Sequence, residues 1–379
     1  MRIEPFAVEQ WMNEYETRCA YNLAETCVES LTVAELLDLA GHGADRLRDE
    51  LLDLKLTYGA IEGSERLRQG IAGLYDRQAA ANVLITHGAI GANHLVHLTL
   101  VEPGDRVVTA VPNYQQHTSI PASIGADVRP LRLRSERRYL PDLDELADLV
   151  GDRAKLVVLT NPNNPTGSLI DRETLEAIVA ICSAAGAWLL CDEVYRGIDQ
   201  DAPGTTASVA DLYERGISTG SMSKAFSLAG LRLGWIAGPT PLIGDVTTHR
   251  DYNTISVGMI DDHLACLAVE HAEAILGRNR DLVRANNAMV DRWVDGRRDL
   301  TWIRPAGGTT GLLRYTDPIP SRELCVDLLH RTGVLLTPGS AIGAEGSLRI
   351  GYANTPSIIA DGLDRLGAHL DGSPAATVG

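Results

Sequence analysis

Lysine is nearly absent from this chain. Only three of the 379 residues are lysines (Lys55, Lys155 and Lys224), although lysine and arginine together number 34. Arginine therefore carries almost all the basic charge, and a lysine among small hydroxyl residues calls for a chemical reason. Unlike a guanidinium, an amine can form a Schiff base with an aldehyde. Lys224, in Ser-Met-Ser-Lys-Ala-Phe-Ser, has this setting, although a surface lysine in a small-residue loop would have the same local sequence.

The chain also lacks an excess of positive charge. Its formal net charge is −16, and no basic stretch interrupts the acidic balance. Binding to a phosphate-rich polymer depends on the release of counterions by clustered basic side chains. The sequence therefore excludes nucleic acid as the main partner, while one small phosphorylated cofactor needs only a local positive pocket.

Clustered cysteines and long apolar runs are missing as well. The six cysteines show neither a CxxC pair nor Cys/His metal spacing, so we expect reduced thiols and no metal site. The N-terminus has no apolar signal region, and no apolar stretch approaches the length of a membrane span. These absences predict a cytoplasmic protein without a membrane partner.

Between about residues 50 and 240 the chain alternates short apolar runs with helical patterns. The runs at 83–86, 106–110, 155–159 and 187–191 predict strands, and the patterns at 93–101 and 175–185 predict helices. Continuous apolar strands that alternate with helices predict a mostly parallel sheet with both faces covered. Functional loops should then leave the carboxyl ends of the strands.

After about residue 256 the pattern changes. Helical patterns at 261–276 and 279–294 precede short predicted strands at 311–314 and 347–350. We therefore predict a large domain over 35–255 and a smaller α+β domain made of 1–34 and 256–379. The composition of the tail at 371–376 predicts a frayed end.

Polar motifs follow several of the predicted strands. Small residues at 87–93 would let backbone N–H groups at a helix N-terminus approach an anion, although such turns also serve packing. Tyr114 could stack on a flat ring or lie in the core. The segment Asn-Pro-Asn-Asn-Pro-Thr-Gly at 161–167 would hold an asparagine rigidly at a strand end. Asp192 needs a cationic partner, for which a protonated ring nitrogen would serve, unless it caps a helix.

The motifs resemble, in this order and spacing, the fold-type I (class I/II) aminotransferases that use pyridoxal 5′-phosphate (PLP). The resemblance rests on 161–167, on Asp-Glu-Val-Tyr at 192–195, and on Lys224 with Arg232 eight residues later. It extends over about 20–370. It implies an α/β fold whose large domain has a mostly parallel seven-stranded sheet between helices, PLP as cofactor, and a homodimer with a shared active site.

The resemblance also implies roles for individual residues. Lys224 would hold PLP as a Schiff base and move the substrate proton, with Asp192 at the ring nitrogen and Tyr195 at the phenolic oxygen. Asn164 would serve both the phenolic oxygen and the substrate, and Tyr114 would stack on the ring. The phosphate would be bound by Ala89, Ile90, Ser221, Ser223 and Arg232, with Tyr58 reaching it from the partner subunit. Arg349 would bind the substrate α-carboxylate, for which bidentate arginine geometry is suited.

The N-terminal segment departs from the family pattern. Where these enzymes commonly have a glycine-rich stretch, this chain has Glu25, with Glu9 also nearby in sequence. A cationic substrate side chain such as a guanidinium would complement Glu25 and Glu9, although an acidic solvated face remains the alternative. For Glu14, Glu16 and Glu29 the solvated face is the preferred interpretation. Tyr-Gln-Gln-His at 114–117 also replaces the family's common Tyr-Pro-x-Tyr.

The motifs indicate the cofactor more strongly than the reaction. Transamination of an α-amino acid is the leading hypothesis. The alternative is elimination and cyclisation of a hydroxylated, arginine-type amino acid, because Glu-bearing N-termini resemble those of enzymes of the capreomycidine synthase type. The same electron-withdrawing cofactor serves both reactions.

Overall fold

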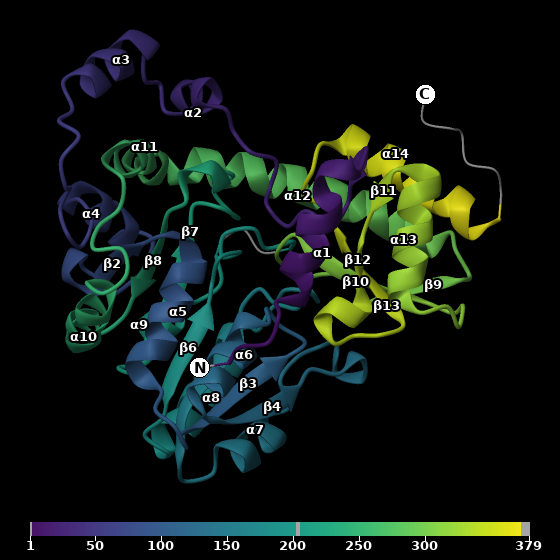
Figure 1. Ribbon diagram of the computed structural model, residues 1–379, viewed down its shortest axis with the longest axis horizontal. Helices are drawn as coiled ribbons and strands as arrows, with labels where there is room; N and C mark the ends of the chain where they lie inside the picture. Colours follow the sequence, from purple (N-terminus) through teal and green to yellow (C-terminus); the bar gives the residue numbers. More distant parts are fainter. Residues whose placement is uncertain (1, 202–204, 373–379) are drawn as a thin grey trace.

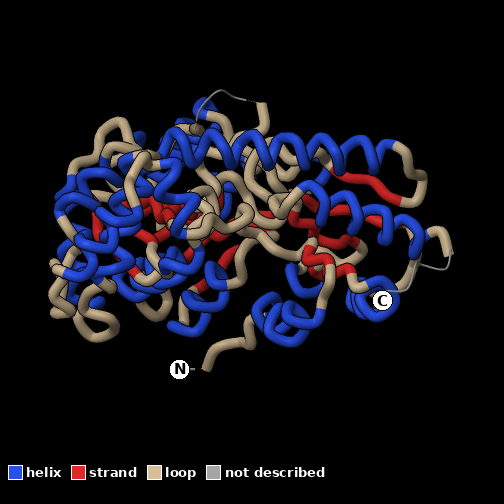
Figure 2. The backbone as a smooth tube through the Cα atoms, turned by 90° about the horizontal axis from the view of Figure 1, so that it is seen from above, coloured by secondary structure: helices blue, strands red, loops and turns tan. Residues whose placement is uncertain are grey.

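Two main β-sheets lie side by side, and helix α12 (Ala272–Asp295) extends from the part of the molecule with the larger sheet to the part with the smaller sheet (Figure 1). The computed structural model describes residues 2–201 and 205–372. Seen from above, the strands of both sheets lie inside and the helices lie outside (Figure 2). Among the described residues, no helix combines the length and apolar character that crossing a membrane requires.

The larger sheet has seven strands in the order β2-β8-β7-β6-β5-β3-β4. Its strands are β2 (Val83–Thr86), β3 (Arg106–Val111), β4 (Asp127–Arg132), β5 (Ala154–Thr160), β6 (Trp188–Asp192), β7 (Gly216–Ser221) and β8 (Gly234–Ala237). All neighbours are parallel except β8, which is antiparallel to both β2 and β7. The predicted mostly parallel, seven-stranded sheet is confirmed, and the four strands predicted above all lie in it.

Helices cover both faces of this sheet, which explains the continuous apolar runs in its strands. In β5, Leu156 and Val158 pack with apolar residues of α5 and α10. Val157 and Leu159 point the other way and pack with α7 and α8. Because side chains alternate along a strand, burial on both faces requires every position to be apolar.

All four predicted helical patterns are helices in the structure, with shifted ends, and further helices accompany them. The helices are α1 (Ala7–Tyr15), α2 (Val33–Leu39), α3 (Ala44–Leu52), α4 (Glu65–Ala72), α5 (Gly88–Leu100), α6 (Gln116–Ile124), α7 (Leu143–Val150), α8 (Arg172–Ala184), α9 (Val209–Leu212), α10 (Thr240–Arg250), α11 (Met259–Glu270), α12, α13 (Ser321–Thr332) and α14 (Pro356–Leu370). The helix predicted at 93–101 begins five residues earlier, at Gly88. The break between the two helices predicted at 261–276 and 279–294 lies at His271 rather than at 277–278, because α12 continues through Gly277.

The second sheet is antiparallel, and the N-terminal segment packs in the same part of the molecule. The sheet consists of β12 (Thr337–Pro338), β13 (Ser347–Gly351), β10 (Thr310–Tyr315) and β9 (Leu300–Trp302), in that order. Beside it β1 (Tyr21–Asn22) pairs in parallel with β11 (Val334–Leu335). The buried Trp11 of α1 donates its indole N–H to the Leu336 carbonyl at 3.0 Å, which fixes α1 to this part of the molecule.

Helices α2 and α3 form an arm that stands away from the body (Figure 1). The last residue of α3, Leu52, and the chain after it, with Leu56 and Tyr58, expose apolar side chains. Helix α14 ends at Leu370, and the predicted fraying at 373–376 lies outside the described residues.

Candidate active site

The site is a pocket of about 390 Å³ beyond the carboxyl ends of β5, β6 and β7, closed on the other side by α1 and the segment 24–27. It brings together nearly all the side chains that the sequence singled out. Lining it are Glu9, Glu25, Ala89, Ile90, Tyr114, Asn164, Asp192, Tyr195, Ser221, Ser223, Lys224, Arg232 and Arg349. Tyr58 does not line this pocket; its side chain is 76% exposed at the foot of the arm.

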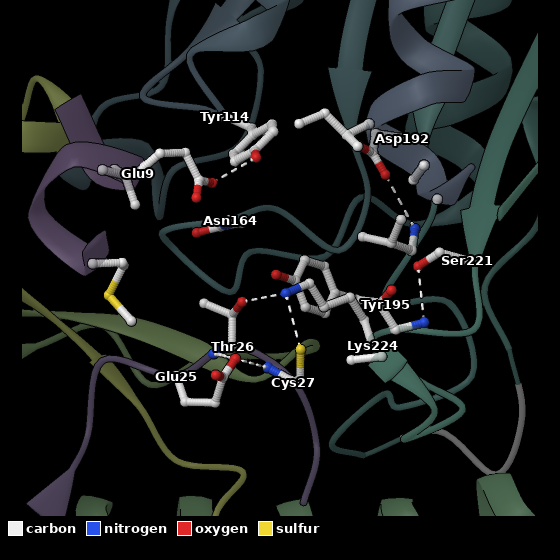
Figure 3. A pocket seen from close by; sticks show the side chains of 18 of the residues that line it. Glu9, Glu25, Thr26, Cys27, Tyr114, Asn164, Asp192, Tyr195, Ser221 and Lys224 are labelled. Atoms are coloured by element: carbon white, nitrogen blue, oxygen red, sulfur yellow. Dashed lines mark hydrogen bonds between the residues drawn. The ribbon is translucent and has the colours of Figure 1, made fainter. Parts of the chain in front are cut away.

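Lys224 reaches across the pocket to the N-terminal segment (Figure 3). Its Nζ donates to Thr26 Oγ1 at 2.5 Å and to Cys27 Sγ at 3.3 Å. Burial alone would lower the pKa of the Lys224 amine, but Cys27, Tyr195 and Glu25 outweigh it, and the pKa is raised. An amine at this place can attack an aldehyde once it gives up its proton.

Asp192 ends β6, and its carboxylate is held in place by neighbouring donors. Asn93 Nδ2 donates to Oδ2 at 2.8 Å, and the Val194 N–H donates to Oδ1 at 3.2 Å. Thr219 in turn donates to Asn93 Oδ1 at 2.7 Å, which fixes the orientation of the amide. A buried, oriented carboxylate in a pocket suits a cationic ligand group such as a protonated ring nitrogen.

Arg349 lies at the other side of the pocket and is only 3% exposed. Nη1 donates to Asn164 Oδ1 at 3.2 Å, and Nη2 donates to the Ala24 carbonyl and to Thr337 Oγ1, both at 3.0 Å. Its Nε has no partner among the described residues. A buried guanidinium with a free N–H in a pocket suits a carboxylate ligand.

Backbone geometry creates a place for an anion beside Lys224. Helix α5 starts at Gly88, whose φ is +67°, so that the N–H groups of Ala89 and Ile90 lie at its N-terminus. A Cβ at Gly234 would lie 2.4 Å from the Ala89 nitrogen, so only glycine allows β8 to approach this turn. Helix N-termini attract phosphate, and Ser221, Ser223 and Arg232 add side-chain donors.

Three carboxylates line one wall of the pocket. Tyr114 donates its hydroxyl to Glu9 Oε1 at 2.8 Å. Glu25 Oε1 accepts the N–H groups of Thr26 and Cys27 at 2.6 and 2.7 Å. Burial acts to raise the pKa of Glu25, but Lys224 and these N–H groups lower it below its usual value.

Glu16 is the third carboxylate. It is exposed, in keeping with the predicted solvated face, but it lies beyond the helix and also lines the pocket. Helix α1 ends at Tyr15, and a 3₁₀ turn over Glu16–Arg18 brings the exposed Glu16 to the pocket. Burial, followed by the charge of Glu25 and a hydrogen bond to it, raises the pKa of Glu16. The sequence pattern also missed Thr26 and Cys27, which had no motif to mark them.

Residues 43–366 match the family described as Aminotransferase class I and II. The chain belongs to this family. It is 33% identical over 379 residues to capreomycidine synthase of Streptomyces vinaceus, and this alignment covers 98% of this chain and 96% of that protein. It is 30% identical over 312 residues to arginine–pyruvate transaminase AruH of Pseudomonas aeruginosa, covering 80% and 79%. A solved PLP-dependent aminotransferase from Streptococcus suis superimposes with a TM-score of 0.95 at 36% identity, covering all of both chains.

The chain is therefore a PLP-dependent enzyme, and its residues fit the cofactor. A lysine amine, an oriented carboxylate and a helix N-terminus with hydroxyl and guanidinium donors share one pocket. No group of three or more metal-ligating side chains occurs within residues 2–201 and 205–372.

Proposed function

We propose that this protein transfers the amino group of an α-amino acid whose side chain is a guanidinium or a similar cation. The observation that carries the proposal is the distribution of charge in the pocket. Arg349 is buried with a free N–H at one place, and Glu9, Glu16 and Glu25 line another. An amino acid with a carboxylate at one end and a cation at the other complements both.

In the proposed reaction, different residues of the pocket have different roles. Bound PLP supplies a ring that withdraws electrons from the substrate Cα. Lys224 holds the cofactor and carries the proton of the substrate Cα, since its Nζ lies in the middle of the pocket. Asp192 would pair with the ring nitrogen and favour its protonated form. Asn164 and Tyr195 would hydrogen-bond the phenolic oxygen, and Tyr114 would stack on the ring.

Binding of the remaining groups follows from charge. Ala89, Ile90, Ser221, Ser223 and Arg232 take the phosphate. Arg349, with Asn164 beside it, takes the substrate α-carboxylate in bidentate geometry. Glu25, whose pKa is lowered, is ionised at neutral pH and is available to the substrate cation.

A matched pair of substrates tests this function. Arginine and citrulline have nearly the same shape, but only the side chain of arginine is charged. With pyruvate as acceptor, alanine formation should have a kcat/KM at least about tenfold higher with arginine as the amino donor than with citrulline, because citrulline loses a charged hydrogen bond. Equal kcat/KM values for the two would remove the cationic-substrate proposal. If no amino acid released one equivalent of its keto acid from the holoenzyme without an acceptor, transamination would be removed.

A second candidate is the elimination of water and ring closure in a hydroxylated guanidino amino acid. It is favoured by the match to capreomycidine synthase, which covers 98% of the chain and so includes most of the acidic segment before residue 43 that the family match omits. The test is to incubate the holoenzyme with 3-hydroxyarginine without a keto acid. Continued turnover with loss of one water favours this candidate, whereas a reaction that stops after one equivalent favours transamination.

The same proposal includes a homodimer in which Tyr58 reaches the phosphate site of the partner subunit. Its support is the exposure of Leu52, Leu56 and Tyr58, which are 77%, 82% and 76% exposed. Contiguous exposed apolar side chains of this size mark interaction surfaces. We also place the enzyme in the cytoplasm, since all six cysteines are free.

A further inference from the structure

Two buried histidines lie behind Asp192, on the side away from the pocket. His97 belongs to α5 and His117 to α6, and neither is exposed to solvent. His97 Nε2 lies 3.3 Å from His117 Nδ1, and His117 Nε2 lies 3.5 Å from Asp192 Oδ2. The three side chains thus form a row that leads from the interior of the molecule to the carboxylate.

The row determines which nitrogen of each ring carries a proton. A neutral imidazole has one N–H and one acceptor nitrogen. The nitrogen of His117 that faces the carboxylate should carry the proton, because an acceptor lone pair there would face an acceptor oxygen. Nδ1 of His117 is then an acceptor, and Nε2 of His97 must donate to it.

The opposite arrangement is less favourable for two reasons. It would place two acceptors, His117 Nε2 and Asp192 Oδ2, 3.5 Å apart in a buried place. It would also leave an N–H on His97 Nδ1, which has no partner among the described residues, whereas a proton on His117 Nε2, although not hydrogen-bonded either, faces a carboxylate oxygen at 3.5 Å. A buried N–H without an acceptor is rarer than a buried acceptor without a donor.

We propose that His97 is a positioning residue for the cofactor site: it fixes the tautomer of His117, so that His117 presents its Nε2–H to Asp192. The carboxylate is then hydrogen-bonded by Asn93 and by the Val194 N–H, and the His117 Nε2–H faces Oδ2 at 3.5 Å as a longer electrostatic contact. Burial, with His117 and His94 nearby, lowers the pKa of His97, which keeps this ring neutral. His97 touches neither cofactor nor substrate, because it does not line the pocket.

Nitrogen NMR of the apoprotein labelled with ¹⁵N-histidine tests the tautomers without any variant. We expect His117 to be protonated at Nε2 and not at Nδ1, and His97 to be protonated at Nε2. Protonation of His117 at Nδ1 would overturn the proposal. This measurement depends neither on the substrate nor on the reaction, so its result is independent of the function proposed above.

Three substitutions separate positioning from packing. In His97→Gln the amide nitrogen lies nearly where Nε2 of the histidine lies, so it can still donate to His117. The side chain of His97→Asn is too short to place its amide nitrogen there, and His97→Leu has no donor. We expect His97→Leu and His97→Asn to weaken PLP binding by the apoprotein roughly tenfold and His97→Gln to stay within about twofold. The pH at which the absorbance of bound PLP titrates should shift in His97→Leu and His97→Asn, but not in His97→Gln.

The outcomes are distinct. If His97→Gln loses as much PLP affinity as His97→Leu, the role of His97 is packing and the proposal fails. If all three variants bind PLP as the wild type does and titrate alike, the histidine row has no effect on the cofactor site, and the proposal fails as well. Should His97→Leu not fold, the comparison of His97→Gln with His97→Asn and the NMR result of the wild type still decide.

Discussion

At the scale of single residues, the pocket separates two kinds of carboxylate. Asp192 is held by Asn93 and the Val194 N–H. Glu25 is held by backbone N–H groups beside Lys224, and Glu16 lies near it. In the proposed function the first kind serves the cofactor, and the second serves the substrate.

The first prediction concerns Glu16. Glu16→Gln should raise the KM for arginine about three- to tenfold, since it removes one partly solvated charge from the wall that binds the cation. The KM for citrulline should change little. Steady-state kinetics with both amino acids check this. Glu14→Gln is the matched control, because Glu14 pairs with Arg322 outside the pocket. An equal effect of both substitutions would mean that only the net charge matters.

The second prediction follows from the raised pKa of Glu16. A cationic substrate binds the ionised carboxylate, so this part of its affinity is present above the raised pKa and is lost as the pH falls through it. The KM for arginine should therefore rise on acidification at a higher pH than an ordinary glutamate would produce. The pH profile of KM in Glu16→Gln should lack this rise. A profile that is the same in the wild type and in the variant would contradict the assignment.

Sequence reasoning placed residues well where a motif marked them and poorly where only the path of the chain decides. Asn164, Asp192 and Lys224 stand at strand ends or in the loops that follow them, and a parallel sheet brings such positions together. The solvated-face interpretation of Glu16 did not include its place at the pocket. The 3₁₀ turn after Tyr15 redirects it, and no local signal distinguishes this turn from a continuing helix.

At the scale of elements, α1 connects the two halves of the molecule. Trp11 binds the Leu336 carbonyl on one side. On the other side Gln115 clamps the start of the helix: its Oε1 accepts the Ala7 N–H at 2.9 Å, and its Nε2 donates to the Pro5 carbonyl at 3.0 Å. The helix therefore holds Glu9 at a defined place in the pocket, and Gln115 explains one departure from the family's common Tyr-Pro-x-Tyr.

The third prediction tests this clamp. Gln115→Ala should increase hydrogen–deuterium exchange at Ala7 and raise the KM for arginine about fivefold through a less well-placed Glu9, with kcat nearly unchanged. Exchange mass spectrometry and steady-state kinetics measure the two effects. Ser119→Ala is the control, because it removes another partner of Gln115 but leaves both bonds to the segment. Unchanged exchange at Ala7 would show that Gln115 does not hold the start of α1.

Element boundaries show the limit of periodicity as a guide. Four of the seven strands of the larger sheet (β2, β3, β5 and β6) were predicted within about a residue, because burial on both faces makes their apolar runs clear. Helix α5 was placed too late, since its first turn has small residues rather than an apolar pattern. The antiparallel direction of β8 could not be derived, because the direction of a strand depends on the connection around it.

At the scale of the whole molecule, the pocket is assembled from segments that are far apart in sequence. Residues of the N-terminal segment, the large sheet and β13 all line it. Substrate selectivity therefore depends on how the second sheet and α1 sit against the large sheet. Near the arm of α2 and α3, Tyr58 is exposed and lies outside the pocket of its own chain.

The fourth prediction tests whether Tyr58 contributes to the site of the partner subunit. In a shared site, Lys224 of one chain works with Tyr58 of the other, so Lys224→Ala and Tyr58→Ala should each impair their own homodimers. A mixed dimer of the two variants contains one site with both residues intact. Random pairing makes half of the dimers mixed, so coexpression should restore about one quarter of wild-type activity. Coexpression of Lys224→Ala with the Lys224→Ala/Tyr58→Ala double variant is the control and should restore none. If Tyr58 acted within its own chain, the mixed dimer would hold no intact site, and coexpression would give only the average of the two separate homodimers.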